Sequence, residues 1–220
     1  MNKRKLLEIS LILTLISFVY IICDYFGLVR YTILHCTKTE SYIKNYRELA
    51  KNSKNRVVLS FTSKPVNIQY LEPLLNSILD QTVKVDKITL NLSTDNGSYI
   101  IPERYKDVLN IYNVGKGYGK WNHLLPTLQR EGEADTIIIY FNDNIVLGKD
   151  CIETILEESS KNPDKVIVSE GVVLVKPKFF DGNIIDCNNK VYDNEWINNH
   201  LLVNVKKIYY NENYLSTKIK

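Results

Sequence analysis

The feature that most limits how this chain can fold is an apolar run close to its N-terminus. Residues 6–29 read LLEISLILTLISFVYIICDYFGLV, and the stretch 9–23 carries no charge. The run is long enough to cross the roughly 30 Å of hydrocarbon in a bilayer. Because no water is available there, the backbone must satisfy its own hydrogen bonds, which predicts one transmembrane helix.

The charges beside this run predict its orientation. Residues 1–5 contain Lys3, Arg4 and Lys5, and positive charge stays on the cytoplasmic side of a membrane. We therefore expect a single-pass type II membrane protein, with residues 1–5 as a cytoplasmic tail and 6–29 as a signal anchor. The rest would be extracytoplasmic, or lumenal in the endoplasmic reticulum or Golgi of a eukaryote. A cleaved signal peptide is the alternative, but bulky residues follow Cys23 where a cleavage site needs small ones.

The remaining chain has the size and composition of one globular domain. Residues 30–55 are polar and predict a stem that is partly helical over 42–51, and residues 56–220 suffice for one domain. Hydrophobic residues make up 45% of the chain and charged residues 24%. Lys and Arg number 28 against 25 Asp and Glu, without a basic stripe, so the sequence does not favour a nucleic-acid partner.

Strand-like and helix-like segments alternate along this domain. We predict strands over residues 57–62, 87–92, 110–114, 136–141, 166–168, 171–175 and 206–210, and helices over 70–79, 102–109, 121–130, 149–160 and 191–203. Such alternation predicts an α/β fold with a Rossmann-like, mostly parallel sheet flanked by helices. Ligands of these sheets bind beyond the carboxyl ends of the strands, which directs attention to loops 63–67, 93–98, 115–120 and 142–148.

The strongest local signal for chemistry follows the most apolar strand, TIIIYF. Asn142, Asp143 and Asn144 come directly after it. Side-chain oxygens in this position can hold a hard cation such as Mn²⁺ or Mg²⁺, which in turn can hold a diphosphate. A nucleotide-sugar donor needs such compensation, because the departing diphosphate develops negative charge. The alternative is a turn that caps the following helix, since Asn and Asp suit turns.

Six segments, taken in order, resemble one known family. They are VVLSFTS at 57–63 with Pro65, LLNSILDQT at 74–82 followed by DKI at 86–88, LNLS at 90–93, HLLPTL at 123–128, GVVLVKPKFFD at 171–181 and DNEWI at 193–197. The order and spacing of these segments are similar to those of the type A glycosyltransferases, in particular the family-2-like group of short membrane-anchored proteins. The resemblance covers about residues 56–210.

This resemblance implies a type A nucleotide-diphospho-sugar transferase fold and transfer of a sugar from a nucleotide-sugar donor to a hydroxyl acceptor on a glycan, lipid or protein. It also implies roles for individual residues. Asp143 with Asn142 and Asn144 would bind the metal, Asp193 or Glu195 would act as the base, and the donor site would include Ser60, Thr62, Ser63, Ser93, Asp95 and His123.

The sequence also departs from the family pattern. The family's metal motif is D-x-D, whereas only Asp143 is acidic here, and an amide oxygen ligates a cation without contributing charge. His123 stands where a lysine is usual, Gly117 where an aspartate is common, and Asn194 in place of a second late aspartate. Two hypotheses follow: a divergent glycosyltransferase, or a catalytically inactive protein that keeps the fold for binding or scaffolding.

The remaining signals are weaker. Cys151 and Cys187 are the first pair to test for a disulfide in an oxidising compartment, with free thiols as the alternative. Asn91 and Asn96 each begin a glycosylation sequon; we expect the first to be inaccessible at a strand end and the second to be open in a turn. The chain has no Gly-x-Ser-x-Gly motif, which argues against a hydrolase.

Overall fold

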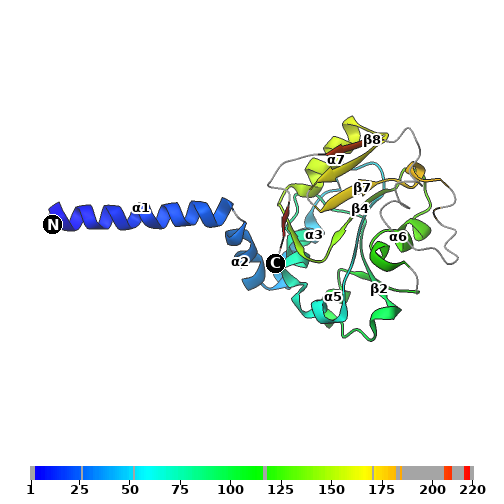
Figure 1. Ribbon diagram of the computed structural model, residues 1–220, viewed down its shortest axis with the longest axis horizontal. Helices are drawn as coiled ribbons and strands as arrows, with labels where there is room; N and C mark the ends of the chain where they lie inside the picture. Colours follow the sequence, from blue (N-terminus) through cyan, green and yellow to red (C-terminus); the bar gives the residue numbers. More distant parts are fainter. Residues whose placement is uncertain are drawn as a thin grey trace.

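The predicted apolar helix is present and stands away from the rest of the chain (Figure 1). The computed structural model describes residues 3–25, 27–51, 53–115, 118–169, 171–181 and 184, and the backbone of 206–209 and 216–218. Helix α1 (Lys3–Tyr25) buries none of its side chains, and it is long and apolar enough to cross a membrane. A helix that is apolar on all sides is usually buried in a protein core or spans a membrane, and α1 is not buried in the described part of this chain.

The domain is built on a sheet in which seven described strands follow the order β3-β2-β1-β4-β7-β6-β8. Their bounds are β1 (Val57–Thr62), β2 (Lys87–Ser93), β3 (Asn110–Val114), β4 (Ile137–Asn142), β6 (Lys165–Ser169), β7 (Val172–Val175) and β8 (Lys206–Tyr209). Strand β7 runs antiparallel to both of its neighbours, β4 and β6, and the other pairings are parallel. The predicted α/β fold with a mostly parallel, Rossmann-like sheet is therefore confirmed.

The order of the strands reverses between β1 and β4. The chain builds β2 and β3 outward on one side of β1 and then returns to place β4 on its other side. The two strands end together, because Thr62 pairs with Asn142 in their parallel register. The loops that follow the two strands therefore begin side by side at this switch in strand order, and we call the place between them the crevice; α/β proteins of this type bind ligands there.

Each face of the sheet carries its own apolar core. Leu59, Phe61 and Ile139 belong to the larger core, which α4 (Glu72–Leu79) and α7 (Cys151–Lys161) cover. Ile138 points to the opposite face and packs in a smaller core with α6 (Leu125–Arg130). Successive strand residues point to opposite faces, so the continuous apolar strand at 137–141 fits a sheet that is covered on both sides. Figure 1 shows α6 on the side of the sheet away from α1.

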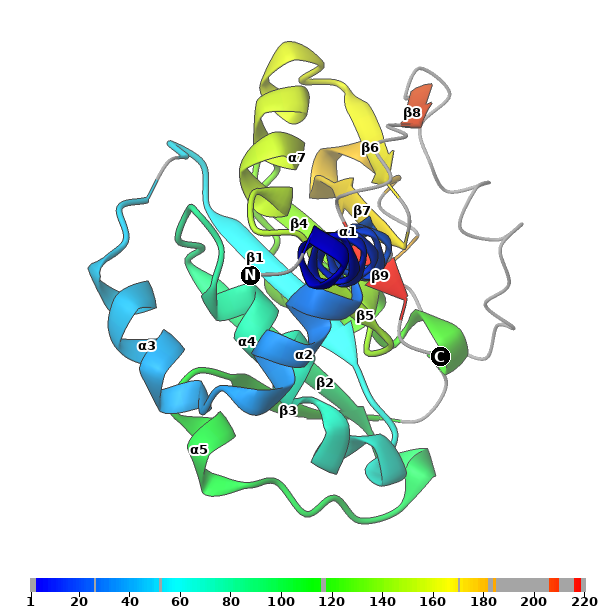
Figure 2. The ribbon, with the colours of Figure 1, turned by 90° about the vertical axis from the view of Figure 1, so that its left-hand side faces the viewer.

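The segment predicted as a polar stem packs on the domain instead of extending from it. It forms α2 (Leu28–Cys36) and α3 (Thr39–Glu48), which lie with α4 on the side of the domain that faces α1 (Figure 2). Leu34, Ile43 and Tyr46 are buried, the last two within the larger core. These three residues fall on the inner faces of the two helices, which explains how a polar segment can still be folded, whereas Ile33 stays exposed.

The remaining elements differ from the predictions in detail. Helix α6 begins at Leu125 rather than at 121, because Pro126 is accommodated in a first turn and not in a helix interior. The short helix at 102–109 is reduced to α5 (Glu103–Lys106). Strand β5 (Ile145–Leu147) was not predicted; it pairs antiparallel with β9 (Ser216–Lys218). The helix predicted over 191–203 lies outside the described residues.

Candidate active site

A polar cavity of about 570 Å³ opens at the carboxyl end of the sheet, over the crevice between β1 and β4. The loops that follow β1, β2, β3 and β4 all contribute to it. Its lining is Thr62, Ser63, Lys64, Asn67, Ser93, Asp95, Asn96, Gly119, Lys120, Asn122, Asn142, Asp143 and Asn144. The four loops indicated by the sequence therefore meet at one place, and seven of the predicted site residues lie in the lining: Thr62, Ser63, Ser93, Asp95, Asn142, Asp143 and Asn144.

Asp143 joins the two strands of the crevice. Its Oδ2 atom accepts hydrogen bonds from Ser63 Oγ at 2.6 Å and from Asn67 Nδ2 at 3.0 Å. Ser63 follows β1, Asn67 lies in the 3₁₀ helix η1 (Pro65–Tyr70), and Asp143 follows β4. The carboxylate is partly exposed and lines the cavity, so it can meet a ligand while its partners fix its position.

Tyr99 fixes a second pair of loops. Its hydroxyl lies 3.3 Å from the carbonyl oxygen of Ser63 and 3.2 Å from that of Ser93, and Asn96 Nδ2 donates to it at 3.2 Å. Ser93 in turn accepts a bond from the backbone N–H of Asp95 at 3.3 Å. The loops after β1 and β2 are thus held together beside the cavity, which favours a preformed site.

Charges of both signs line the cavity. Asp95 and Asp143 are its acids, and Lys64 and Lys120 are its exposed bases. The two lysines, Asn67 and Asn122 were not among the residues predicted for the site, and Asn96 was predicted only as a glycosylation site. All five lie in or next to loops that the sequence indicated, but a polar surface residue and a polar ligand contact look the same in a sequence. The lysines give the cavity groups that can hold an anion without a metal.

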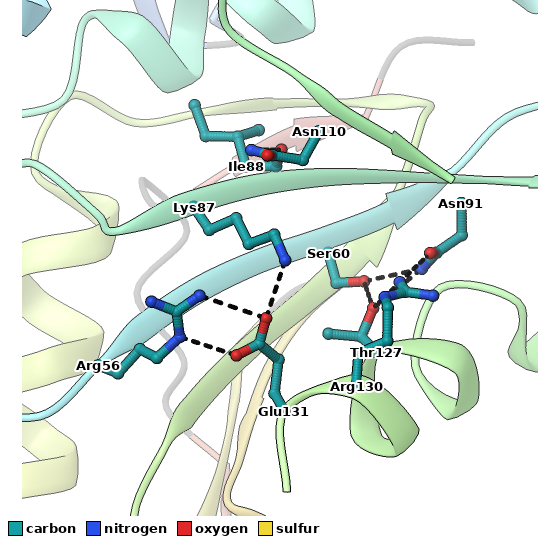
Figure 3. Close-up of polar contacts among 9 residues, drawn as sticks. All are labelled: Arg56, Ser60, Lys87, Ile88, Asn91, Asn110, Thr127, Arg130 and Glu131. Atoms are coloured by element: carbon teal, nitrogen blue, oxygen red, sulfur yellow. Dashed lines mark hydrogen bonds and ion pairs between the residues drawn. The ribbon is translucent and has the colours of Figure 1, made fainter. Parts of the chain in front are cut away.

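Ser60, predicted to contact the nucleotide, lies within β1 and is fully buried, with its side chain toward α6 and outside the cavity lining. Its Oγ lies 2.6 Å from Thr127 Oγ1 on α6 and accepts a bond from Asn91 Nδ2 at 3.1 Å (Figure 3). Arg130 donates to Asn91 and to Thr127, and its guanidinium stacks over the Tyr112 ring, 3.9 Å from the centroid. We call Ser60, Asn91, Thr127 and Arg130 the buried network; it joins β1, β2 and α6.

A second polar group beside this network ties the same elements together near the start of β1. Glu131 receives hydrogen bonds from Arg56 Nε at 2.7 Å and from Lys87 Nζ at 3.1 Å (Figure 3). Burial alone would raise the pKa of Glu131, but the bonds and charges of the two bases outweigh it and hold that pKa below its usual value. The Glu131 carboxylate therefore serves the fold at the end opposite the cavity.

His123, predicted at the donor site, also lies outside the cavity lining. Its side chain is 9% exposed, and its ring lies 5.5 Å from Trp121 and 4.9 Å from Tyr140 between ring centroids. Burial lowers the pKa of His123 to about 4, although a hydrogen bond to the backbone of Lys120 opposes the shift. The imidazole is therefore neutral at pH 7, and its neighbours Asn122 and Lys120 are the residues that reach the cavity.

The predicted metal site has a weak set of donors. Among the described residues, no three His, Cys, Asp or Glu side chains come together in a group that could hold a metal ion. Asp143 is the single carboxylate of its motif, and Ser63 and Asn67 already occupy its Oδ2 atom. These donors do not fit a tightly bound divalent cation, for which several carboxylate oxygens are usual. The Mn²⁺ or Mg²⁺ ion stays a prediction.

Several predicted residues cannot be placed. Asp193 and Glu195, the predicted bases, lie outside the described residues, and so does Cys187. Its predicted partner Cys151 is a free, fully buried thiol, and burial raises the pKa of Cys151 to about 12. A thiol in that state is unreactive.

No protein-family model matches this chain, and no curated protein matches it. Among solved structures, it is similar to TarS of S. aureus (11% identity, TM-score 0.41), covering 52% of this chain and 21% of that one. It is also similar to the glycosyltransferase GlyE of Streptococcus pneumoniae TIGR4 (13% identity, TM-score 0.44), covering 71% of this chain and 45% of that one. A third is the cytidylyltransferase IspD of Francisella tularensis (13% identity, TM-score 0.47), covering 76% of this chain and 94% of that one.

The chain thus spans much less than two thirds of TarS and of GlyE. With identities of at most 13% and TM-scores below 0.5, we base no functional conclusion on these similarities.

Proposed function

We propose that the protein is a glycosyltransferase, anchored by α1, that binds a nucleotide-sugar donor in the cavity and transfers the sugar to a hydroxyl acceptor. The supporting observation is the meeting of Asp143, Ser63 and Asp95 with two lysines at the crevice between β1 and β4. In the same proposal, residues 1–5 are cytoplasmic and the domain is extracytoplasmic, as the basic N-terminus favours.

The charges of the cavity suit a nucleoside diphosphate. Lys64 and Lys120 carry the positive charge that two phosphate groups require, and their exposed ammonium groups can move to meet them. Asp95 and the neighbouring amide Asn96 offer acceptors and donors for a ribose or a base. We assign supporting roles to Ser60 and His123, because both are buried outside the lining.

The transfer itself needs a base and an acceptor for negative charge. In the proposed step, a carboxylate takes the proton of the acceptor hydroxyl, whose oxygen attacks the anomeric carbon while the bond to the diphosphate breaks. Asp193, or Glu195 beside it, is the proposed base. The leaving nucleoside diphosphate gains negative charge, which the two lysines offset. A Mn²⁺ or Mg²⁺ ion that arrived with the donor would use Asp143, Asn142 and Asn144.

One observation favours a second function, a binding protein without catalysis. The Asp143 carboxylate is already engaged by Ser63 and Asn67, and the two residues beside it, Asn142 and Asn144, are uncharged. A cavity of this kind can hold a nucleotide through hydrogen bonds while providing little stabilisation of a transition state.

Calorimetry of the full-length protein in detergent separates these functions. UDP and GDP are titrated with and without Mn²⁺, and the matching sugar nucleotides are then tested for release of the sugar. Asp143→Asn is compared with Asp107→Asn, an exposed residue outside the cavity lining. Binding and turnover that Asp143→Asn alone reduces support the transferase. Binding without turnover supports the binding protein, and absence of any binding overturns both.

A further inference from the structure

Helix α2 differs from an ordinary surface helix in the face it turns outward. Its exposed residues are Leu28, Thr32, Ile33, His35 and Cys36, and none of them is an acid, a lysine or an arginine. Leu28 is 53% exposed and Ile33 is 55% exposed. The Thr32 hydroxyl donates to the Leu28 carbonyl at 2.7 Å, so its hydrogen bond is made within the helix and not to water. An outward face of this composition is unfavourable in water.

The inward face of α2 is fixed to the domain by its one charged residue and by a cap. Arg30 Nε donates to the Leu147 carbonyl at 2.9 Å, and Arg30 Nη1 pairs with Asp80 Oδ2 at 2.8 Å. Asn76, which is fully buried on α4, donates to the carbonyls of Leu34 at 2.7 Å and Thr37 at 2.8 Å. These bonds satisfy carbonyls at the C-terminal end of α2, which helices otherwise leave unpaired.

The position of α2 follows directly from that of α1. Gly27 lies between the two helices with φ of 70°, a left-handed conformation that glycine adopts readily, and it ends the first helix. Figures 1 and 2 both show α2 running across the end of α1 rather than continuing it. Tyr25 at the end of α1 is 62% exposed, and the ring of Tyr31 on α2 stacks on that of His35 with 5.9 Å between ring centroids. Tyrosines are enriched at the membrane surface, so their presence next to the end of α1 fits such a surface.

We propose that α2 is an interfacial helix whose outward face lies on the phospholipid bilayer, so that Arg30 and Asn76 hold the domain in one orientation against the membrane. The inference rests on α1 spanning the bilayer, but not on the activity of the cavity. Interfacial helices bury their apolar face about 5–10 Å into the boundary between headgroups and acyl chains. Such helices usually expose their other face to water, whereas the other face of α2 packs on the domain.

The depth of α2 can be measured on the full-length protein in phosphatidylcholine vesicles. An environment-sensitive fluorophore is attached to Ile33→Cys, with Leu13→Cys in α1 as the bilayer reference and Gln129→Cys in α6 as the water reference. Cys23, Cys36 and Cys187 are replaced by Ser, and Cys151 is buried. We expect spin-labelled lipids to quench positions 13 and 33, and aqueous iodide to quench position 129 alone. Iodide quenching at 33 equal to that at 129 overturns the inference, whereas loss of lipid quenching at 13 overturns the anchor as well.

The fixed orientation has its own test. Energy transfer from a label at position 129 to an acceptor on the lipid headgroups reports the height of the domain above the bilayer. We expect Arg30→Gln to broaden the distribution of heights, and Arg104→Gln, which removes another partly exposed ion pair, to leave it unchanged. An unchanged distribution in Arg30→Gln, or the same broadening in both variants, overturns the role of Arg30.

Discussion

Ser60 and Ser63 are near neighbours on one stretch of chain, and both were predicted to contact a nucleotide, but their surroundings differ. Ser60 is sealed in the buried network, where Asn91 and Thr127 meet its hydroxyl. Ser63 lies just past the end of β1; its side chain is also buried (3% exposed), but it donates to Asp143, whose partly exposed carboxylate lines the cavity. The difference lies in where the strand ends: before that point a polar side chain serves the packing of the sheet, and beyond it the side chain positions a carboxylate that a ligand can reach.

The largest expected effect is on the buried network. Asn91→Leu removes the side chain that bonds Ser60, Thr127 and Arg130, and leaves these buried groups without its bonds. We expect unfolding free energy to fall by about 3 kcal/mol or more, measured by urea denaturation. Asn67→Leu in the cavity should cost less than about 1 kcal/mol, because solvent replaces the lost bond. Equal losses in the two variants contradict the comparison.

The next effect concerns pH. His123 in the folded protein binds its proton only near pH 4, whereas the unfolded chain binds it near pH 6.5. The stability it contributes is therefore complete above pH 6.5 and is lost as the pH falls toward 4, by up to about 3 kcal/mol. The difference between wild type and His123→Phe should show this slope in thermal unfolding scans. His35→Phe on the exposed face of α2 is the control, and the same slope in that difference refutes the assignment to His123.

A smaller effect is expected at the cavity. Lys64→Ala and Lys120→Ala should each weaken nucleoside diphosphate binding about tenfold, or about 1.4 kcal/mol, because each removes one charge near the phosphates. The melting temperature should change little, since both side chains are exposed. Lys161→Ala at the end of α7 is the matched control in the same calorimetric titration. If both variants bind like the control, the lysines do not hold the diphosphate.

The smallest effect sharpens the contrast between buried and open positions without disturbing stability. When the protein is expressed in a eukaryotic secretory pathway, mass spectrometry should find a glycan on Asn96 and none on Asn91. Asn91 is fully buried in the network, whereas Asn96 is exposed at the cavity. A glycan on Asn91 contradicts the burial, and absence of one on Asn96 speaks against a lumenal domain.

The seven described strands of the main sheet, their alternation with helices and the place of the cavity were predictable, because apolar runs such as those at 57–62 and 136–141 have few alternatives to a buried strand. The short strand β5 was not predictable in this way. The cavity followed from topology, since parallel strands bring their end loops together. What the sequence could not show was the direction of each side chain. Both faces of β1 are covered, so no alternation of polar and apolar residues revealed that Ser60 points into a core.

The packing of α2 and α3 was missed for a different reason. Residues 30–55 are polar overall, and the few apolar residues that matter, such as Leu34 and Ile43, become significant only when their helices meet α4. The end of α2 is bonded to a polar residue of α4, Asn76, which resembles any surface asparagine in the sequence. Long-range partners of this kind are decided by tertiary structure and not by local pattern.

The proposed position of α2 on the bilayer affects how tightly the cavity has to bind its ligand. A domain kept at a constant height above the lipid searches a plane instead of a volume for any molecule that diffuses in the same leaflet. Confinement of this kind raises effective concentration into a range of about millimolar. A polar cavity with two acids and two lysines in its lining is then sufficient for capture, and molecules that are free in solution are at a disadvantage.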